Sequence, residues 1–491
     1  MQLTVQSGQS LHGAVTVPGD KSLSHRAALF AALAEGESVI DRFLVSGVTR
    51  AMLDALTALG VAWQVKDQRL TVCSAGLDGW RAPAAPLDCR NSATTIRLLA
   101  GAIAATGIDA TLDGSAGLRR RPMDRIVEPL RQMGVQITPA ANGGAPLRLH
   151  GRLPDQRLRA IDYTLPVASA QVKSCLLLAA LAADAPVTIR EPGPSRDHTE
   201  RMLRAMGVRV DVHSRTEQGS QSSPLQFVAN GCKWNGGRSS ATLVRNAQTN
   251  LTDKVDQTRS DHGDPSTTHS VTIHPPSAPL QPLRLQLAGD ISSAAFLIVA
   301  ALITPGSEIL IRDVGLNPTR TGLLDALRAM GADIRAGNLR DWSGEPVGDL
   351  TVRHSPLHAT RVAGDLVVRM IDEFPIFAVA AACAQGVTEV REAAELRHKE
   401  SDRITAVAKE LCAIGVAIEP LPDGFRITGG AVAGGSVDPH GDHRIAMSCA
   451  VAGLVAKQPV AIEGAEIMNE SFPAFREILA TLGANVESKG S

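Results

Sequence analysis

The chain has 491 residues, of which 44% are hydrophobic, 20% are charged and 3% are aromatic, and its formal net charge is −1. This composition is typical of a soluble globular protein, and the length exceeds what one hydrophobic core usually organises, so we expect two large domains. The neutral charge and the scarcity of aromatic residues argue against a general binder of nucleic acids or membrane surfaces.

Targeting signals and cysteines point to the same class of protein. No apolar run approaches the ~20 residues needed to span a bilayer, and residues 1–15 lack the features of a signal peptide. The seven cysteines are dispersed, without CxxC or His-paired spacing. We therefore expect a cytoplasmic protein with reduced thiols, no metal site and no cofactor.

The first predicted helix follows a strand-like stretch that ends at Pro18-Gly19-Asp20. Its composition and periodicity indicate a helix over residues 24–34, which places Lys21 and Ser22 at the N-terminus. Arg26 lies four residues after Ser22, on the same helical face. Free backbone N–H groups at a helix start favour an anion, so the segment predicts a phosphate site. A solvated, positively charged first turn is the alternative interpretation.

One phrase recurs six times along the chain. Each copy begins with Leu at the end of a helical run, and Leu, Met or Ile follows three positions later. A Gly comes next, then Val or Ala, and then a run of β-type residues. The six glycines are Gly60, Gly134, Gly207, Gly331, Gly415 and Gly483. Each copy is typical of an amphipathic helix that ends at a Gly and leads into a strand. The pattern predicts an α/β protein built from six units of about seventy residues.

The longest interval between these glycines contains residues 214–270, which are rich in Ser, Thr, Asn, Gln, Asp and Gly. Such a composition buries too little apolar surface to offset the entropy of ordering, so we expect a disordered insertion without a catalytic role. The flanking runs 208–213 and 270–274 alternate in polarity. We therefore expect the insertion to replace the turn of a β-hairpin.

Six further segments place polar or charged residues before apolar helical runs. They are Asn91-Ser92-Ala93-Thr94-Thr95, Arg119-Arg120-Arg121-Pro122, Ser169-Ala170-Gln171-Val172-Lys173, Asp372-Glu373-Phe374-Pro375, His398-Lys399-Glu400-Ser401-Asp402-Arg403 and Gly441-Asp442-His443-Arg444. We expect the segment 398–403 to start a helix that carries Lys399 and Arg403 on one face. Taken singly, each segment is explained by solvated capping; together they repeat one arrangement.

That arrangement suits a pair of substrates that carry several phosphates and carboxylates. A nearly neutral protein binds them by concentrating cations in one place; the candidates are Lys21, Arg26, Arg121, Lys399, Arg403 and Arg444. The carboxylates Asp372 and Glu400 among these cations are candidates for proton transfer, because the surrounding charges tune their pKa values. We therefore expect acid–base and electrostatic chemistry.

At this point the motifs resemble a known family. The segments PGDKSLSHRA, NSATTIRLL, LRRRPM, PVASAQVKS, GDISSAA (289–295), LNPTRTG (316–322), IDEFP, RHKESDR and GDHR resemble 5-enolpyruvylshikimate-3-phosphate synthases. They follow that family's order over nearly the whole chain outside the insertion, and they look most like the bacterial branch that tolerates the herbicide glyphosate. The resemblance implies transfer of the enolpyruvyl group of phosphoenolpyruvate to the 5-hydroxyl of shikimate 3-phosphate, with release of phosphate.

The resemblance also implies the fold and the assembly. It predicts an α/β protein of six βαβαββ repeats in two similar domains, with the active site between them. Residues 18–287 would form the first domain, and residues 1–17 with 288–491 the second. We expect a monomer that binds the two small-molecule substrates.

By resemblance, the matching positions have roles. Shikimate 3-phosphate would be bound by Lys21, Ser22, Arg26, Ser169, Ala170, Gln171, Ser195, Asp372 and Lys399. Phosphoenolpyruvate would be bound by Lys21, Ala93, Arg121, Gln171, Arg403 and Arg444. Asp372 would accept the proton of the 5-hydroxyl, and Glu400 would protonate the methylene carbon of the enol.

Two positions depart from the family pattern in ways that bear on substrate affinity. Met468 is expected where the glyphosate-sensitive branch has a lysine in the phosphoenolpyruvate site, and Arg90 replaces a common glycine. At position 93 the family usually has Gly, and we expect the methyl group of Ala93 to hinder glyphosate more than phosphoenolpyruvate.

Two other functions compete with this interpretation. The sister enolpyruvyl transferase acts on a UDP-amino sugar, but it usually carries a reactive Cys in the loop before Arg-Pro, and residues 118–122 contain none. A non-catalytic scaffold that binds anionic metabolites would bind better without Asp372 and Glu400.

Overall fold

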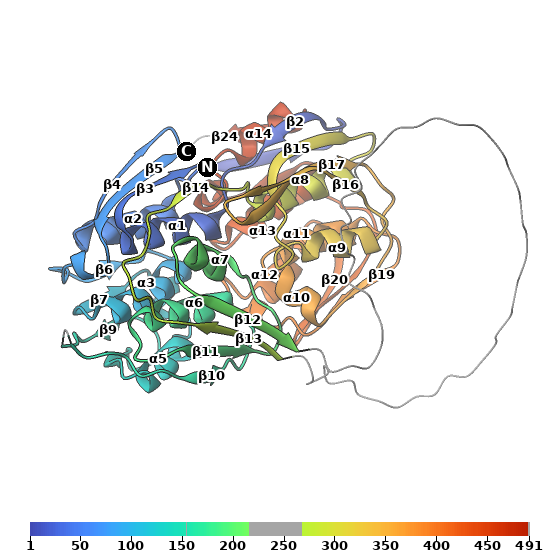
Figure 1. Ribbon diagram of the computed structural model, residues 1–491. Coiled ribbons are helices and arrows are strands. Elements are labelled where there is room, and N and C mark those ends of the chain that lie inside the picture. Colours follow the sequence, from blue (N-terminus) through green and yellow to red (C-terminus); the bar gives the residue numbers. More distant parts are fainter. Residues whose placement is uncertain (154, 216–267, 490–491) are drawn as a thin grey trace, which may run out of the picture.

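The strands of the chain form six sheets of four strands each within the part that the structure describes (Figure 1). That structure is a computed structural model, and it describes residues 1–153, 155–215 and 268–489. In every sheet one parallel pair is followed by two antiparallel strands. The predicted α/β repeat fold is thereby confirmed.

Three sheets form what we call the first lobe. Their strand orders are β14(Arg284–Gln286)-β3(Glu35–Asp41)-β5(Arg69–Ala75)-β4(Ala62–Lys66), β6(Leu87–Asp88)-β7(Ala110–Asp113)-β9(Leu147–Leu149)-β8(Ile137–Thr138) and β10(Asp162–Thr164)-β11(Val187–Glu191)-β13(Thr268–Ile273)-β12(Val210–Arg215).

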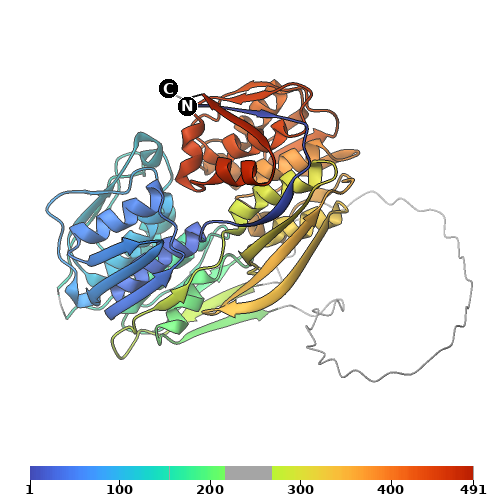
Figure 2. The same ribbon diagram turned by 90° about the horizontal axis from the view of Figure 1, so that it is seen from above.

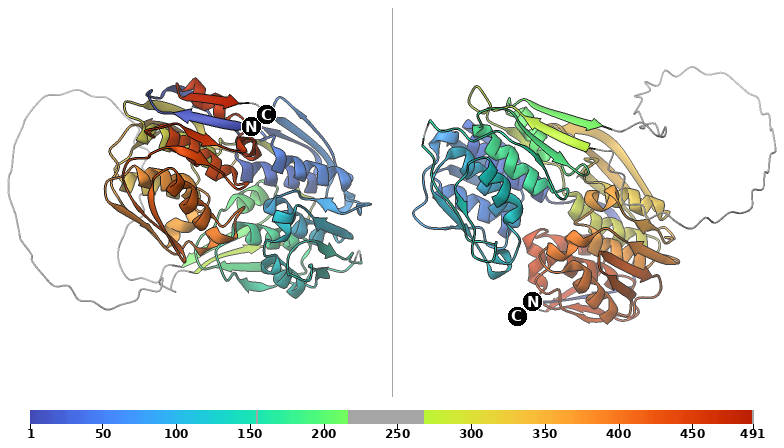
Figure 3. Two further views of the ribbon diagram at one scale, coloured as in Figure 1. Left: turned by 180° about the vertical axis from the view of Figure 1, so that it is seen from behind. Right: turned by 90° about the horizontal axis from the view of Figure 1, so that it is seen from below.

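The other three sheets form the second lobe, which includes the first two strands of the chain. Their strand orders are β16(Asp333–Trp342)-β17(Glu345–Arg353)-β15(Glu308–Gly315)-β2(His12–Thr16), β18(Arg361–Val362)-β19(Val387–Val390)-β21(Gly424–Thr428)-β20(Ala417–Leu421) and β22(Gly435–Val437)-β23(Val460–Ile462)-β1(Gln2–Gln6)-β24(Asn485–Lys489). In Figures 2 and 3 the two lobes lie on opposite sides of the molecule.

The helices of each lobe are of two kinds. Six are buried almost all round: α1(Lys21–Leu33), α3(Ala93–Thr106), α6(Ala170–Ala179), α8(Ile291–Ile303), α11(Phe374–Ala382) and α13(His443–Gly453). The others are α2(Gly47–Ala58), α4(Ala116–Arg119), α5(Asp124–Gln132), α7(His198–Ala205), α9(Gly322–Ala329), α10(Asp365–Arg369), α12(Arg403–Ala413) and α14(Phe475–Thr481). Over the described residues, no helix combines the length and apolarity that crossing a bilayer requires.

The buried helices form the two hydrophobic cores. One core contains α1, α3 and α6, and the other contains α8, α11 and α13. Close packing requires a glycine on α3, because a Cβ atom at Gly101 would lie 2.1 Å from the backbone oxygen of Cys175 on α6. Since a helix that is apolar all round has no solvated face, most polar residues of these helices lie in the first two turns. Five of the polar segments identified in the sequence lie at or just before the starts of buried helices; they are residues 18–22, 91–95, 169–173, 372–375 and 441–444.

The six recurring glycines end helices in the same way. Each has a positive φ, between +87° and +103°. The N–H two residues beyond the helix bonds back to a carbonyl in the last turn, for example Val61 to Leu56 at 3.0 Å and Ala484 to Leu479 at 3.0 Å. This is the Schellman motif, in which glycine avoids the strain of the left-handed conformation. The predicted helix–Gly–strand repeat is confirmed at all six positions.

The chain crosses between the lobes twice. β2 of the second lobe leads into α1 of the first, and β14 of the first leads into α8 of the second. The crossings bond to each other reciprocally, with Asp20 N–H to Ala288 O and Asp290 N–H to Pro18 O, both at 2.9 Å. Gly19 fits this junction because a Cβ atom there would lie 1.8 Å from the backbone oxygen of Arg42.

The hairpin predicted around the insertion is present. β12 and β13 pair antiparallel from Val210 with Ile273 to Arg215 with Thr268. The predicted boundaries 214–270 were therefore slightly too wide, since residues 214–215 and 268–270 belong to the strands, where backbone pairing outweighs their polar composition. The remainder of the insertion, 216–267, lies outside the described residues.

Candidate active site

Side chains just before four of the buried helices cap the helix N-termini. Residues next to these caps are therefore free of the capping role and are candidates for binding anions. Asp20, Ser92, Ser169 and Asp442 accept hydrogen bonds from backbone N–H groups of the first turns of α1, α3, α6 and α13. The adjacent positions hold candidate binding residues, including Lys21, Ala93, Ala170 and Arg444. The capping signals thus place several candidates where helix dipoles favour anions.

The first lobe contributes Lys21, Ser22 and Arg26 on α1. Arg26 is 2% exposed, and its guanidinium donates to Thr199 Oγ1 at 2.9 Å, to Ser174 Oγ at 2.8 Å and to the backbone oxygen of Ser22 at 3.2 Å. Arg26 therefore supports the start of α1 from within the lobe as well as adding positive charge there.

A second arginine of this lobe reaches the junction between the lobes. Arg196 donates to Asp372 Oδ2 at 2.5 Å and to Ser22 Oγ at 3.4 Å. It lies just before α7 in a segment where no recurring motif marked it, and the sequence analysis missed it. A cation directly after Ser195 and before a helix start was the available signal.

Gln171 on α6 is held by neighbours on α3. Its Oε1 accepts from Arg97 at 2.6 Å, and its amide donates to Thr94 Oγ1 at 3.0 Å. Arg97 also donates to the backbone oxygen of Pro122 at 3.1 Å. The contacts join the segments of Ala93, Gln171 and Arg121, and Arg97 is a second residue that sequence reasoning missed.

Ser195 belongs to a buried ionic cluster. Its hydroxyl donates to Glu191, and Lys173 lies 2.7 Å from Glu191 and 2.8 Å from Glu200, all with side chains that are 0% exposed. A buried carboxylate requires such partners, and here they fix the loop that carries Arg196. The Ser195 hydroxyl is thus directed toward Glu191.

In the second lobe, Asp372 is surrounded by cations. Its Oδ1 lies 3.6 Å from Lys399 Nζ and 3.6 Å from an Nη of Arg403. Burial would raise the pKa of Asp372, but Arg196, Lys399, Arg444 and Arg403 together hold that pKa well below its usual range. The carboxylate is therefore ionised and able to accept a proton.

Glu400 occupies a similar environment. Its Oε2 accepts from Arg403 at 2.7 Å, and its Oε1 lies 3.7 Å from Arg121 of the first lobe. Burial would raise the pKa of Glu400, but Arg403, Arg121, His443 and Lys21 hold it well below its usual range. Anions bound to these cations would offset their charge and so raise this pKa.

Lys21 and Arg444 add positive charge from opposite lobes. Burial and the charge of Arg444 lower the pKa of Lys21, while Glu400, Asp372 and Asp290 act to raise it. Arg444 is 4% exposed, and its nearest carboxylate is Glu373 at 3.8 Å. Because the charge of Arg444 lowers the pKa of Lys21, the two cations repel each other, and both would stabilise an anion bound between them.

Five of the predicted cations lie around Asp372 and Glu400, with one correction to the sequence analysis; they are Lys21, Arg121, Lys399, Arg403 and Arg444. Lys399 and Arg403 do not share a helix, because Asp402 caps α12 at Arg403 and Lys399 precedes that cap. Met468 is 4% exposed and belongs to the second hydrophobic core, so it adds no positive charge, and its place beside a donor site stays a prediction. Glu470 of the same segment faces the first lobe instead, lining a pocket with Arg90.

Arg90 itself has an unusual backbone. Its φ is +50°, in the left-handed region that favours glycine. Its side chain compensates by ion-pairing with Asp54 at 2.8 Å and by donating to the backbone oxygen of Gly47 at 3.3 Å. The departure from glycine at this position therefore has a local structural basis.

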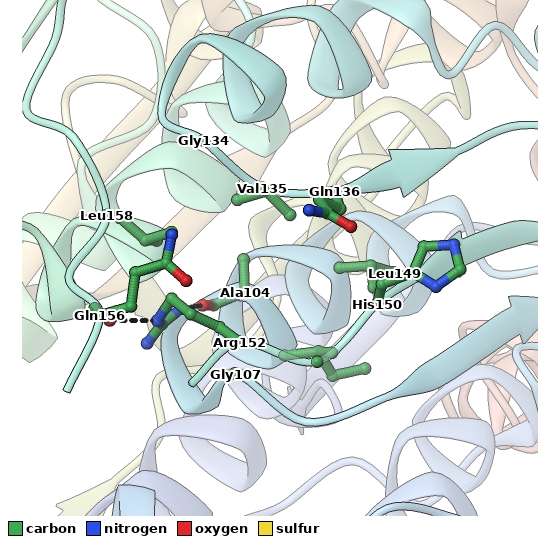
Figure 4. A pocket seen from close by; sticks show the side chains of 12 residues that line it. Ala104, Gly107, Gly134, Val135, Gln136, Leu149, His150, Arg152, Gln156 and Leu158 are labelled. Atoms are coloured by element: carbon green, nitrogen blue, oxygen red, sulfur yellow. Dashed lines mark hydrogen bonds between the residues drawn. The ribbon is translucent and has the colours of Figure 1, made fainter. Parts of the chain in front are cut away.

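A pocket outside this site is shown in Figure 4. It lies at the C-terminal end of α3, whereas Ala93 is at the N-terminal end of that helix. Its volume is about 30 Å³, enough for a water molecule but not for a metabolite. Arg152 donates there to the backbone oxygens of Ala104 at 2.6 Å and Ala105 at 2.9 Å, which caps the helix. Among the described residues, no group of His, Cys, Asp and Glu has the arrangement to hold a metal ion.

Comparisons with known proteins are consistent over the whole length. The family model described as EPSP synthase (3-phosphoshikimate 1-carboxyvinyltransferase) matches residues 5–243 and 263–479. A 3-phosphoshikimate 1-carboxyvinyltransferase of Halorhodospira halophila is 45% identical over 488 residues, covering 99% of this chain and 97% of the relative. One of Herpetosiphon aurantiacus is 45% identical over 479 residues, covering 97% and 98%. The structure of EPSP synthase from Acinetobacter baumannii matches with a TM-score of 0.78 and 38% identity, covering 99% of this chain and 100% of that one.

Proposed function

This chain belongs to the EPSP synthase family, and we propose a role in its reaction for each residue that gathers between the lobes. The enzyme is a 3-phosphoshikimate 1-carboxyvinyltransferase, which transfers the carboxyvinyl group of phosphoenolpyruvate to the 5-hydroxyl of shikimate 3-phosphate and releases phosphate. The observation that supports the proposed roles is the ring of cations from both lobes around two ionised carboxylates, Asp372 and Glu400.

Shikimate 3-phosphate binds mainly to the first lobe in this proposal, and Lys399 reaches it from the second lobe. Its anionic groups are held by Lys21, Ser22, Arg26, Ser169, Ala170, Gln171 and Lys399, and Arg196 joins this set because it reaches both Ser22 and Asp372. Ser195 contributes once its hydroxyl turns from Glu191 toward the phosphate. A cationic surface of this kind orients the acceptor through charge-assisted hydrogen bonds.

Phosphoenolpyruvate binds between Lys21, Ala93, Arg121, Gln171, Arg403 and Arg444. Arg121 and Arg403 each retain a buried guanidinium nitrogen without a hydrogen-bond partner among the described residues. Since an unsatisfied buried donor costs about 1–3 kcal/mol, a bound phosphate or carboxylate that accepts from these nitrogens gains that energy. This supports a donor site that is completed by the substrate.

The chemistry then requires two proton movements. Asp372 accepts the proton of the attacking 5-hydroxyl as the new C–O bond forms. Glu400 delivers a proton to the methylene carbon, so that cationic character develops at the neighbouring carbon, which the 5-oxygen attacks. One of the methyl protons then returns to Glu400 as the C–O bond to phosphate breaks and the double bond re-forms, and the proton on Asp372 leaves to phosphate or solvent. Glu400 takes up its proton once substrate anions offset the charge of Arg403 and Arg121.

The proposal also covers the domain boundaries, the oligomeric state, the cellular location and the response to glyphosate. The domains are residues 18–287 and residues 1–17 with 288–491, which matches how the sheets divide at the two crossings. The protein works as a monomer in the cytoplasm, and the enzyme tolerates glyphosate through Ala93. Transfer to a UDP-amino sugar, the activity of the sister family, is the competing function.

The experiment that tests the function measures phosphate release with each substrate alone, with both, and with a UDP-amino sugar in place of shikimate 3-phosphate. Release only with the two proposed substrates together is expected, and faster turnover with the UDP-amino sugar would contradict it. The residue roles are tested with Asp372→Asn and Glu400→Gln, each of which should lower kcat by roughly 10²-fold or more. Near-normal kcat in either variant would remove that residue from its proton-transfer role.

A further inference from the structure

Arg320 is buried at the place where the two crossings of the chain meet. It is 3% exposed and lies between β15 and α9 of the second lobe. One Nη lies 3.3 Å from Asp20 Oδ2, and the other lies 3.6 Å from Asp290 Oδ1. Among the described residues, no other cation comes within ion-pair distance of either carboxylate.

These two carboxylates are the caps of equivalent helices in the two lobes. Asp20 accepts from the backbone N–H of Leu23 at the start of α1, and Asp290 accepts from that of Ser292 at the start of α8. Asp290 also faces the backbone N–H of Lys21 at 3.4 Å. One guanidinium thus fixes the starts of a helix from each lobe, including the residue that carries the first cation of the active site.

A second branch from Arg320 leads to the opposite wall of the site. Arg320 donates to Ser292 Oγ at 2.8 Å, and Ser292 in turn donates to Glu373. Glu373 directly follows Asp372 in the chain and lies 3.8 Å from Arg444. Arg320 is therefore connected to Arg444 through two intermediate residues, Ser292 and Glu373, and it contacts the caps that hold Lys21.

From these contacts we propose that Arg320 is a positioning residue, which fixes Lys21 and Arg444 relative to each other by clamping Asp20, Asp290 and Ser292 at the crossings. The inference rests on the proposed function for the role of those two cations. Arg320 itself does not touch substrate, and its effect is on the geometry of the groups that do. The planar fork of arginine suits this task, because it reaches two carboxylates and a hydroxyl at once.

The electrostatics of the caps support this clamp. Burial and the neighbouring charge of Asp20 raise the pKa of Asp290 to about 6, against the opposing charges of Arg320, Arg444 and Lys21. Burial also acts to raise the pKa of Asp20, but Arg320, His198 and Arg196 bring it to about 2. Without Arg320, two buried carboxylates would face each other with much less compensation, and the junction would have to rearrange or bind a proton.

The test compares Arg320→Met, which keeps much of the volume and removes the charge, with Arg320→Lys, which keeps the charge and removes the fork. The control is Arg335→Met, because Arg335 is 68% exposed on β16 and pairs only with Asp333. Turnover is measured per folded molecule, well below each variant's unfolding temperature. We expect a 10- to 100-fold lower kcat in Arg320→Met, partial recovery in Arg320→Lys and wild-type kinetics in the control.

A double-mutant cycle separates positioning from stability. Asp290→Asn keeps a capping side chain but removes the charge, so it should lessen the loss caused by Arg320→Met and should allow that variant to fold if the single variant does not. An Arg320→Met protein, alone or with Asp290→Asn, that is folded and retains kcat and KM within about threefold of its parent would overturn the inference. A wild-type protein that releases no phosphate would instead overturn the proposed function.

Discussion

The guanidinium of Arg196 donates to Asp372 at 2.5 Å and so joins two residues that are 176 positions apart and belong to different lobes. The contact brings the cation within 3.4 Å of Ser22 on the far side of the site. Among the cations that lower the pKa of Asp372 against the effect of burial, Arg196 has the largest effect. Arg196 thus affects both acceptor binding and the protonation state of the proposed base.

Replacing Arg196 by Met should therefore produce two separable effects. Loss of a charge-assisted contact of about 1.5–3 kcal/mol should raise the KM for shikimate 3-phosphate roughly 10- to 150-fold. The pKa of Asp372 should also rise toward its ordinary value, so the acid limb of the pH profile of kcat/KM should move to higher pH. Steady-state kinetics at neutral pH measure the first effect, and the second is measured by following the acid limb below pH 4.5, to the lowest pH at which the enzyme stays folded. Arg190→Met is a suitable control, since Arg190 is an exposed partner of Asp162 on β11, and an unchanged acid limb in Arg196→Met would contradict the proposed coupling.

Arg196 also illustrates what sequence reasoning reached and what it missed. Helix starts and ends depend on short-range chemistry, so the caps Asp20, Ser92 and Asp442 and the six recurring glycines could be predicted. Arg196 acts through Asp372, 176 positions away, and Arg320 acts in part through Asp20, 300 positions away. Residue type alone does not distinguish these arginines from surface arginines. Only the fold brings these arginines to their carboxylates.

Short-range reasoning also failed where two local signals competed. The segment 398–403 contains cations spaced for one helical face, but Asp402 is a stronger cap and starts α12 after Lys399. The result is nevertheless compatible with the predicted site, because Lys399 and Arg403 approach the same oxygen of Asp372 from different backbone conformations.

Buried histidines should make the folded protein sensitive to mild acid. Burial lowers the pKa of His25 to about 4 and that of His443 to about 3. Both side chains are neutral in the folded state, whereas the unfolded chain protonates near its ordinary value of about 6.5. Their contribution to stability is therefore complete above pH 6.5 and decreases as the pH falls toward the folded-state values, by about 2 kcal/mol for each histidine at pH 5.

Thermal unfolding between pH 7.5 and 5 measures this effect. His25→Gln should show a smaller decrease of the midpoint over that range than the wild type, because one of the two titrating groups is gone. His358→Gln, at an exposed position, should retain the wild-type dependence. A His25→Gln protein whose midpoint falls as steeply as that of the wild type would exclude His25 as a source.

Removing the insertion should leave the enzyme active. Arg215 and Thr268 are paired residues at the end of an antiparallel hairpin, so an Asn-Gly turn can replace residues 216–267 without moving either strand. We expect kcat and KM within about twofold of the full chain and an unchanged unfolding midpoint. An insoluble product, or a loss of more than tenfold in kcat/KM, would indicate that the segment stabilises the first lobe or acts at the site.

Ala93 should determine the response to glyphosate. It is the first residue of α3, directly after the cap Ser92, and it is 5% exposed. We expect its methyl group to narrow the proposed phosphoenolpyruvate site, and one methyl group of overpacking costs ~1–3 kcal/mol, or roughly 5- to 150-fold in affinity. Phosphoenolpyruvate is short enough to fit, whereas the longer glyphosate must compress against the methyl group.

Ala93→Gly should therefore lower the inhibition constant for glyphosate within that range and leave kcat nearly unchanged. Ala105→Gly is a matched control, because Ala105 lies at the other end of α3 and is also 5% exposed. It should destabilise the helix to a similar degree, since glycine costs about 1 kcal/mol relative to alanine in a helix, without altering inhibition. A wild-type enzyme inhibited by low micromolar glyphosate would refute the tolerance itself. If glyphosate inhibits the wild type and Ala93→Gly equally, the cause of the tolerance lies in another residue of the site.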